Sequence, residues 1–463
     1  MIYIVEFIVT AFRESPYHVI TEIFFAVLLL VLLLQKAHNP TKEKPLTKKE
    51  EDELIAEWEP EPLSRPLNEE EKWELSTIPL IESKPGIMVT MNGKKTLNFG
   101  SYNFLGVVDL PEFTEAAKKE IYKYGVGTCG PRGFYGTLQI HLDLEQRLAK
   151  FMGTPEAILY AYGFATISSA IPTLAKRGDV IFCDEGVSFA VQTGVTLSRS
   201  KVYYFRHNDV DHLEEFLKLQ DEIDQKYSCR LAIEESLSLG VLGKTERGIC
   251  EYYNISRDAV ECTTSSLGNA FSSVGGFCCG SAIVVKQQTL LGAGYCFSAS
   301  LPALLCGSSL KVLDILEHNE KIEGPDNIFS KLKTLSLHFR AELAGIHGLE
   351  VAGDPSVPLV HLRLNSKTSQ KNRHKNERIL QEIVNKCFES EYPLGLTRAK
   401  YSEEEYLMPP PSIRICISAS HSKEQLTKAA QVLKKVAESV FRDGISFDNE
   451  LNSNEINSNN LDN

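Results

Sequence analysis

Residues 138–183 read LQIHLDLEQRLAKFMGTPEAILYAYGFATISSAIPTLAKRGDVIFC, and they give the clearest indication of fold class in the chain. Apolar residues recur with a helical period in 138–151 and 167–176, whereas 157–159 and 180–183 are short, uninterrupted apolar runs. Amphipathic helices that alternate with short apolar strands are typical of an α/β layer around a mostly parallel sheet. We therefore predict an α/β domain built outward from this stretch, with the preceding residues 113–124 as a further helix.

The pattern differs on both sides of this layer. Upstream, residues 87–91 and 96–99 flank Asn92-Gly93, a dipeptide that favours the type I′ turn of a β-hairpin. Downstream of Leu310 the order becomes helix, strand, strand, helix, strand, helix. We expect these helices near 331–343, 377–387 and 423–441 and two of the strands near 359–364 and 413–417. The sequence therefore predicts a large domain over 85–312 and a smaller C-terminal α+β domain over 313–443.

Composition narrows the classes of function. The chain has 463 residues and a net charge of −12, with 49 Lys and Arg against 61 Asp and Glu, so nonspecific binding of nucleic acid through a basic surface is disfavoured. Eleven cysteines form an odd number with no CxxC spacing. We therefore expect reduced, mostly buried thiols and no metal site.

One N-terminal segment is apolar enough to be a membrane anchor. Residues 19–34 read VITEIFFAVLLLVLLL, and the anchor is expected at about 16–35 within an N-terminal segment 1–36. Sixteen helical residues span about 24 Å, which suits a thin membrane such as that of the endoplasmic reticulum. The upstream flank is not basic, which argues against a cleaved signal peptide. Five lysines follow the segment, which predicts a single pass with the main body in the cytosol. They are Lys36, Lys42, Lys44, Lys48 and Lys49.

Two polar segments flank the predicted domains. Residues 37–84 carry 13 acidic and 7 basic residues and read as an acidic linker with one helical patch, KKEEDELIAEWEP. Residues 444–463 are rich in Asn, Ser and Asp, and we expect them to be a disordered tail.

The densest glycine cluster is GVGTCGPRGFYG at 125–136. A dinucleotide-binding GxGxxG must follow a strand, but this one follows the helical pattern PEFTEAAKKEIYKYG, so that interpretation fails. The glycines let the backbone approach a ligand or a second subunit closely, and Arg132 is available for an anion. A purely structural loop is the alternative.

Several motifs occur together in the order found in one family. They are 103–106, 125–137, 141–145, 207–209, 274–277, 295–302 and 413–419. With them the chain resembles the α-oxoamine synthase family of pyridoxal-phosphate enzymes over residues 85–442. The resemblance implies the aspartate-aminotransferase fold (fold type I), with a large domain around a mostly parallel sheet and a small C-terminal domain. Within the family the chain is most similar to a subunit of the enzyme that condenses L-serine with palmitoyl-CoA to 3-ketosphinganine, CO₂ and CoA.

The same resemblance shows which cofactor contacts are altered. The family's Schiff-base lysine position holds Asn269, and an amide cannot form the imine. The family's Asp-Glu-Ala-His becomes Glu234-Glu235-Ser236-Leu237, and Ser188 replaces the stacking histidine. The phosphate-cradling turn persists at Gly163 and Phe164, where it is expected to be vestigial. We therefore predict no catalytic residue in cis, with pyridoxal 5′-phosphate held by the lysine of a partner subunit.

In this family the active site lies at a dimer interface, so loops of this chain are expected to complete the partner's site. The predicted contact residues are Cys129, Arg132, Tyr135, Phe297, Ser298 and Ser300. For Ser298 a helix N-cap ahead of Pro302 is an alternative. Arg414 occupies the position of a substrate-carboxylate arginine, although it could instead pair structurally. Small membrane regulatory subunits are also expected partners, whereas nucleic acid is not.

Three hypotheses follow for the whole chain. The first is a membrane-anchored, noncatalytic subunit of a heterodimer. The second is a self-sufficient homodimeric α-oxoamine synthase, and the third is a nonfunctional truncated isoform. The third arises because family members carry about forty residues, a strand and its crossover helix, that are missing here near 227–232.

Overall fold

A computed structural model describes residues 10, 13, 15–34, 46–223 and 229–443. Its contacts group the chain into two compact units, Met1–Ser76 and Thr77–Asn463. The predicted tail at 444–463 and the lysines at 36–44 after the anchor lie outside the described residues.

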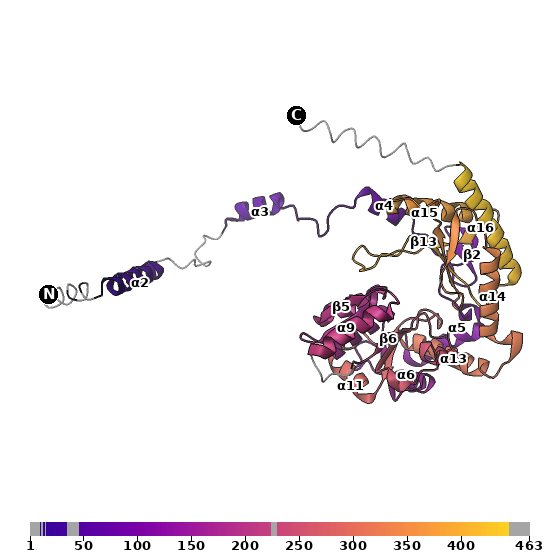
Figure 1. The fold of residues 1–463 in the computed structure, drawn as a ribbon, viewed down its shortest axis with the longest axis horizontal. Coiled ribbons are helices and arrows are strands. Elements are labelled where there is room, and N and C mark those ends of the chain that lie inside the picture. The colour runs from indigo at the N-terminus through magenta and orange to yellow at the C-terminus, as the bar shows by residue number, and fades with distance from the viewer. Residues whose placement is uncertain (1–9, 11–12, 14, 35–45, 224–228, 444–463) are drawn as a thin grey trace. The chain divides into compact units, whose positions relative to one another are not determined.

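The first unit contains three helices among its described residues: α2 Pro16–Leu34, α3 Lys48–Glu57 and α4 Glu69–Ser76 (Figure 1). By length and composition α2 can cross a membrane, with a mean hydropathy of 2.4 and no buried residue in its most apolar window. The helix coincides with the predicted anchor. Helix α3 begins at a capping box in which the side chain of Thr47 accepts a hydrogen bond from Glu50 N and Glu50 reciprocates. The helical patch predicted in the linker is therefore confirmed, but α4 is a second helix in the linker that was not predicted.

The second unit opens with the predicted hairpin. Strands β1 Met88–Met91 and β2 Lys94–Asn98 pair antiparallel around Asn92 and Gly93, whose φ angles are 46° and 75°. Positive φ at both turn residues is what a type I′ turn requires, so that prediction is confirmed. Strand β11 Leu394–Gly395, about 300 residues later, joins β2 in parallel to complete a three-stranded sheet.

The large α/β layer contains a four-stranded sheet with the order β3-β8-β7-β6. Strands β3 Glu156–Tyr160, β7 Cys262–Ser266 and β6 Ala232–Glu234 run in one direction, and β8 Gly276–Gly280 runs opposite to them. The described helices of this layer are α5 Pro111–Tyr124, α6 Gln139–Met152, α7 Gly163–Leu174, α8 Phe189–Ser198, α9 Val210–Ile223, α10 Ile249–Tyr252, α11 Ala282–Leu291, α12 Ala293–Cys296 and α13 Ala303–Asn319. The helices predicted at 113–124, 138–151 and 167–176 correspond to α5, α6 and α7.

Two further strands form a separate sheet. Strand β4 Val180–Asp184 pairs in parallel with β5 Lys201–Phe205, and α9 contacts β5 (Figure 1). Only one residue of β4, and none of β5 or β6, is fully buried, whereas four of five residues of β3 and β7 are. Among the described ladders, β4 and β6 each pair on one side only, so each leaves a free edge.

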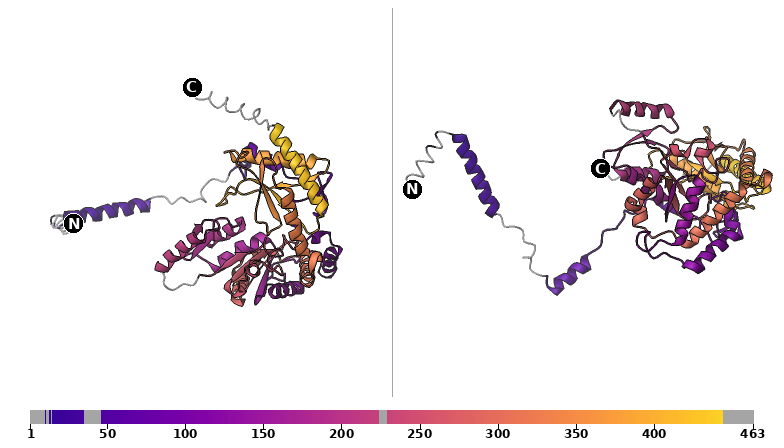
Figure 2. Two further views of the ribbon diagram at one scale, coloured as in Figure 1. Left: turned by 45° about the vertical axis from the view of Figure 1, so that its right-hand side comes forward. Right: turned by 90° about the horizontal axis from the view of Figure 1, so that it is seen from below.

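The C-terminal part contains an antiparallel sheet with the order β12-β13-β10-β9. Its strands are β9 Leu349–Ala352, β10 Leu359–Leu364, β12 Thr397–Arg398 and β13 Ser412–Cys416. Its main helices are α14 Ile328–Glu342, α15 Arg373–Glu389 and α16 Lys423–Asp443, and α16 packs against α14 and α15 (Figures 1 and 2). The α+β pattern predicted after Leu310 is thus present.

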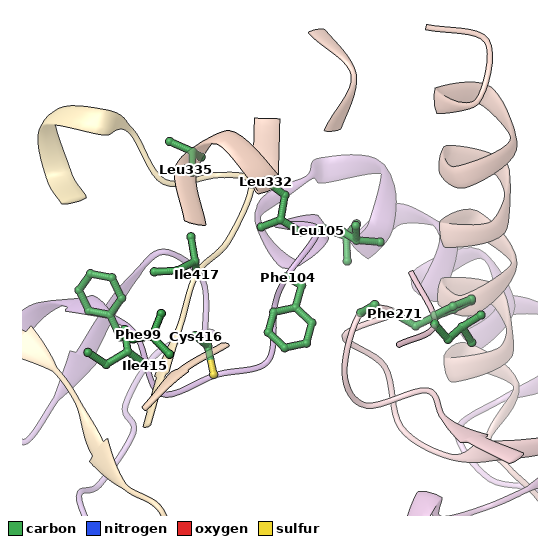
Figure 3. Close-up of a cluster of buried hydrophobic side chains, with 14 of the residues drawn as sticks. Phe99, Phe104, Leu105, Phe271, Leu332, Leu335, Ile415, Cys416 and Ile417 are labelled. Atoms are coloured by element: carbon green, nitrogen blue, oxygen red, sulfur yellow. The ribbon is translucent and has the colours of Figure 1, made fainter. Parts of the chain in front are cut away.

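One hydrophobic core runs through both parts of the second unit. Figure 3 shows Phe99, Phe104 and Leu105 from the N-terminal side beside Leu332 and Leu335 of α14. Ile415, Cys416 and Ile417 reach the same cluster from the end of β13, and Phe271 reaches it from the loop after β7. The division into domains at 312 and 313 remains a prediction, because contacts keep Thr77–Asn463 together as one unit.

Candidate cofactor and partner site

Asn269 lies in the loop between β7 and β8, and its amide is used locally. Its Nδ2 donates to the Ser236 carbonyl oxygen at 2.7 Å, and its own carbonyl accepts from Ser272 N at 3.0 Å. The side chain therefore ties this loop to the turn after β6. An amide held in this way supplies neither a nucleophilic amine nor a base for imine chemistry.

Glu234, the last residue of β6, also uses its carboxylate to bind the loop that follows the strand. Its Oε1 accepts from Ser236 N at 3.0 Å and from the Ser236 hydroxyl, which in turn accepts from Ser266 N at 2.7 Å. Burial raises the pKa of the Glu234 carboxyl above its ordinary value. Leu237, at the family's histidine position, is half exposed and adds no polar contact.

The turn that opens α7 is packed closely against β7. A Cβ at Gly163 would lie 2.5 Å from the Ser266 hydroxyl, so only glycine fits between this turn and β7. Phe164 is 51% exposed and its ring lies 6.1 Å from that of Phe189. Ser188 is exposed and precedes α8 as its N-cap residue.

Together these residues do not fit a pyridoxal phosphate bound covalently in cis. The lysine is replaced by an amide that is already bonded, the acid is bonded to its own turn, and a hydroxyl replaces the stacking ring. The glycine turn is the part of the pocket that persists. The loss of cofactor contacts in this chain remains a prediction, which these local hydrogen bonds favour.

Glu235, beside Glu234, has a structural role that the sequence alone did not indicate. Its carboxylate is fully buried and accepts from Arg257 Nη1 at 2.8 Å, Ile249 N at 2.7 Å and the Ser238 hydroxyl at 2.8 Å. Three donors around one carboxylate, one of them the charged Arg257 guanidinium, fix the segment that follows β6. The pair of adjacent glutamates is therefore divided between two local networks.

Arg132 is not available for an anion, and that prediction is wrong. Its Nη1 and Nη2 bind the two Glu145 carboxylate oxygens at 2.7 and 2.9 Å, and its Nε donates to the Thr137 hydroxyl at 3.1 Å. Only 6% of its side chain is exposed. These three contacts within the chain occupy the guanidinium. Its bidentate partner, Glu145, lies on α6, thirteen residues later in the sequence.

Ser300 is likewise committed inside the chain. Its N and its hydroxyl both donate to the Gly130 carbonyl oxygen, at 3.0 and 3.1 Å, while the Thr128 hydroxyl donates to the Ser300 carbonyl oxygen at 3.2 Å. Ser298 is half-buried and its hydroxyl donates to the Ala299 carbonyl oxygen. Pro302, not Ser298, stands at the N-cap of α13, so the alternative role of Ser298 as a cap is wrong.

His141 adds a further anchor that sequence reasoning missed. Its Nδ1 accepts from Leu138 N at 3.0 Å, so its Nε2 carries the proton and donates to the Leu301 carbonyl oxygen at 2.6 Å. Burial lowers the pKa of this fully enclosed ring, which keeps it neutral. The glycine-rich loop and the segment before α13 are thereby joined into one surface.

That surface is apolar and exposed. Cys129 and Tyr135 have φ angles of 59° and 65°, which hold both residues outward on tight turns. Tyr135, Phe297 and Phe134 are among its exposed side chains, with Phe297 86% exposed. Exposed apolar side chains on two segments that are hydrogen-bonded to each other favour an interaction site here. The role of Cys129, Tyr135 and Phe297 in contacting a partner remains a prediction that this exposure favours.

Arg414, on β13, contacts the N-terminal part of the same unit. Its Nη1 donates to the Tyr102 hydroxyl at 2.6 Å, its Nη2 donates to the Gly100 carbonyl oxygen at 2.9 Å, and its guanidinium lies over the Tyr102 ring. These contacts support structural pairing, the alternative that the sequence left open.

Comparison with known proteins identifies the family. The model of the aminotransferase class I and II family matches residues 94–232 and 222–433. The match is thus made in two pieces that meet at 222–232, between α9 and β6.

Solved structures share the fold. Serine palmitoyltransferase of Sphingomonas wittichii gives a TM-score of 0.69 at 21% identity, covering 86% of this chain and 99% of that one. A serine palmitoyltransferase with its pyridoxal-phosphate internal aldimine gives 0.68 at 20% identity, covering 84% and 97%.

Relatives of known name cover nearly the whole chain. Serine palmitoyltransferase 1 of Dictyostelium discoideum is 43% identical over 471 positions, covering 94% of this chain and 96% of its own length. Because 94% of 463 residues is about 435, about 36 of those positions have no counterpart here. Long chain base biosynthesis protein 1 of Arabidopsis thaliana is 35% identical over 91% of each chain. The chain therefore belongs to the class I and II aminotransferase family, in the group of serine palmitoyltransferase 1 and long chain base biosynthesis protein 1.

Proposed function

We propose that this chain is the cofactor-free subunit of a heterodimeric serine palmitoyltransferase. The enzyme condenses L-serine with palmitoyl-CoA to 3-ketosphinganine, CO₂ and CoA, the first step of sphingolipid biosynthesis. The observation that carries the proposal is Asn269, whose amide is hydrogen-bonded to Ser236 where catalytic relatives need a lysine. The partner subunit supplies that lysine and holds the pyridoxal phosphate. This chain alone is expected to be inactive.

Pyridoxal phosphate, when bound on the partner, acts as an electron sink for the carbanion that forms at the serine Cα. The residues of this chain do not touch that chemistry in cis. They present a rigid apolar surface, formed by the glycine-rich loop and the segment around Phe297, to the partner's site. The Arg132–Glu145 ion pair and the hydrogen bonds from Ser300 to Gly130 hold the loop in shape, so that little entropy is lost when the partner docks.

Helix α2 supports a membrane location. Nineteen residues of helix span about 28 Å at 1.5 Å per residue, close to the hydrocarbon thickness of the endoplasmic reticulum membrane. We propose a single pass with the main body in the cytosol, where palmitoyl-CoA is accessible. Small membrane regulatory subunits would then contact α2 rather than the α/β body.

A second candidate, a defective truncated form, is favoured by one specific observation. In the part of the chain that the structure describes, the α/β strands form two separate sheets, β3-β8-β7-β6 and β4-β5, and each sheet ends in a free strand edge. We infer that a strand–helix unit of family length is missing between α9 and β6. A chain with an open sheet could fail to assemble even though its partner surface is intact.

Co-purification tests the proposal. The tagged full-length chain is expressed with a lysine-bearing partner subunit in cells that lack their own copy of this chain, and the eluate is assayed for 3-ketosphinganine. We expect the partner to co-elute and product to form. Borohydride reduction followed by peptide mass mapping should then place the cofactor on the partner alone. A matched sample with the partner's lysine replaced by alanine should bind normally and form no product.

Each outcome separates the hypotheses. A Schiff base that borohydride fixes to this chain would refute the cofactor-free role and support the self-sufficient homodimer. Loss of partner binding by a chain that melts cooperatively would locate the defect at the interface. A chain without a cooperative melting transition would instead show that the open sheet prevents folding.

A further inference from the structure

The C-terminal α+β part contains a cavity that none of the predicted site residues lines. Its volume is about 310 Å³, near the lower limit for small-molecule sites in proteins. It lies where β9 and β10 meet the residues before α15 and the prolines that lead into β13. One part of the cavity is lined by charged side chains, and another part is lined by apolar side chains.

Two opposite charges face the cavity from neighbouring strands. Arg363 on β10 and Glu350 on β9 are direct cross-strand partners, so both side chains project from the same face of the sheet. Among the described residues the Arg363 guanidinium has no hydrogen bond or ion pair, and its Nε is buried without a partner. A buried guanidinium N–H that lacks an acceptor is costly, which makes this group a candidate for a ligand.

Two other arginines near this sheet, Arg340 on α14 and Arg414 on β13, are already engaged. Arg340 donates to the carbonyl oxygens of Asp354 and Leu359, and Arg414 binds Tyr102 and Gly100. Burial, together with the charges of Arg363, Arg414 and Arg340, lowers the pKa of His361 to about 4, so this imidazole is neutral. Among the described residues that line the cavity, Arg363 is therefore the cation without a hydrogen-bond or ion-pair partner.

The rest of the lining is small and mixed. Ser366 and Ser369 contribute exposed hydroxyls, while Leu364, Pro410 and Pro411 form an apolar side. The amide of Asn376 is saturated by the backbone of Gln370, with bonds of 2.8 and 2.9 Å, so it shapes the wall and offers little to a ligand.

We propose that this cavity binds a small zwitterionic α-amino acid. Its carboxylate pairs with the Arg363 guanidinium and its ammonium with Glu350, while a short side chain lies between the serine hydroxyls and the prolines. A simple anion would meet the Glu350 carboxylate, and a simple amine would meet Arg363. A zwitterion satisfies both charges at once, and the cavity is too small for a nucleotide or an acyl-CoA. The proposal does not depend on the function proposed above.

Calorimetric titration of the full-length chain in detergent tests this, with L-serine and L-alanine as probes and acetate, ethylamine and inorganic phosphate as partial mimics. We expect saturable binding of both amino acids at one site and none of the mimics. Arg363→Gln and Glu350→Gln should each weaken binding by at least about tenfold, the effect of losing one charge-assisted hydrogen bond. Lys367→Gln, which removes an exposed charge nearby, should leave binding unchanged.

Thermal melting of each variant confirms that it is folded. Phosphate or acetate binding to the wild-type chain, unchanged in Glu350→Gln, would overturn the zwitterion and indicate a plain anion site. Amino-acid binding that survives Arg363→Gln in a folded chain would place the site elsewhere. Absence of saturable binding by the wild-type chain would refute the proposal outright. Because this chain has no lysine at position 269, none of these signals can arise from a Schiff base there.

Discussion

Replacement of Arg132 by alanine should destabilise the chain strongly, although the residue sits in a surface loop. The side chains of Arg132 and Glu145 are only 6% and 14% exposed and form two N–O contacts of 2.7 and 2.9 Å. Glu145 Oε1 also accepts from Leu159 N at 2.9 Å, so the carboxylate joins the loop to α6 and β3. Arg132→Ala leaves that carboxylate buried with one backbone donor. Breaking one partner of a buried pair costs about 3–5 kcal/mol.

This cost predicts a measurable change in melting temperature. One kcal/mol corresponds to about 2–4 °C in domains of 150–250 residues, so a loss of about 3–5 kcal/mol in Arg132→Ala should lower the melting temperature by roughly 6–20 °C. The double variant Arg132→Ala/Glu145→Gln removes the buried charge but keeps an acceptor for Leu159 N. It should recover more than half of the loss, because the larger part of the cost is the unpaired charge.

A surface ion pair provides the matched control. Arg147 binds Asp314 and Glu317 at 3.0 and 3.1 Å, but its side chain is 32% exposed and those of its partners are 54% and 36% exposed. Exposed pairs contribute about 0–1 kcal/mol, so Arg147→Ala should lower the melting temperature by less than about 4 °C. Differential scanning fluorimetry of the purified full-length variants measures all four proteins. The reasoning would be refuted if Arg132→Ala and Arg147→Ala had the same melting temperature. It would also be refuted if the double variant melted no higher than Arg132→Ala, because the buried charge would then not be what stabilises the loop.

Three further changes probe the same chain. Glu246 has φ 58°, a buried Oε2 without a partner among the described residues, and a pKa raised by burial to about 9. Because the folded state binds this proton more tightly than the unfolded state, its contribution to stability is complete below pH 4.5 and is lost as pH rises toward 9. The melting temperature of Glu246→Gln should therefore exceed that of wild type by a margin that widens from pH 5 to pH 9. A constant margin would contradict this. Gly136→Ala places a Cβ 2.0 Å from the Gly130 carbonyl oxygen, so it should lower the free energy of unfolding by about 1–3 kcal/mol and weaken co-purification of the partner. A Cβ at Gly133 meets no described atom within 4 Å. Gly133→Ala is therefore the control and should change neither stability nor co-purification. Cys129→Trp, at an exposed position with φ 59°, should reduce 3-ketosphinganine formation or alter amino-acid selectivity in the assembled enzyme while the melting temperature changes little. An unchanged rate and product spectrum would remove Cys129 from the interface.

Local patterns predicted local structure well in this chain. The Asn92-Gly93 turn, the period of α6 and α16 and the apolar run of β3 each depend on neighbours within a few residues, and each is present. Altered cofactor positions such as Asn269 were also visible, because flanking motifs fixed their register.

Long-range polar pairing was not visible. Arg132 was predicted to face an anion because its partner on α6 cannot be chosen from the sequence among several carboxylates. Ser300 was predicted to face a partner, but its acceptor is Gly130, which lies 170 residues earlier. In both cases the tertiary fold brings together groups whose pairing leaves no periodic or compositional signal.

The divided sheet follows from connection lengths. A parallel strand needs a crossover of a dozen or more residues, and a strand with its helix takes about thirty or more. Helix α9 ends at Ile223 and β6 begins at Ala232, so only eight residues separate them. These eight residues are enough to connect α9 to β6 but too few to form a further strand and helix between β4 and β6. The match to the family model is also divided at this point. The relative from Dictyostelium has about 36 extra positions, which is room for one such unit. Because native domains are stable by only about 5–15 kcal/mol, the free edges of β4 and β6 bear directly on whether this form of the chain folds and assembles.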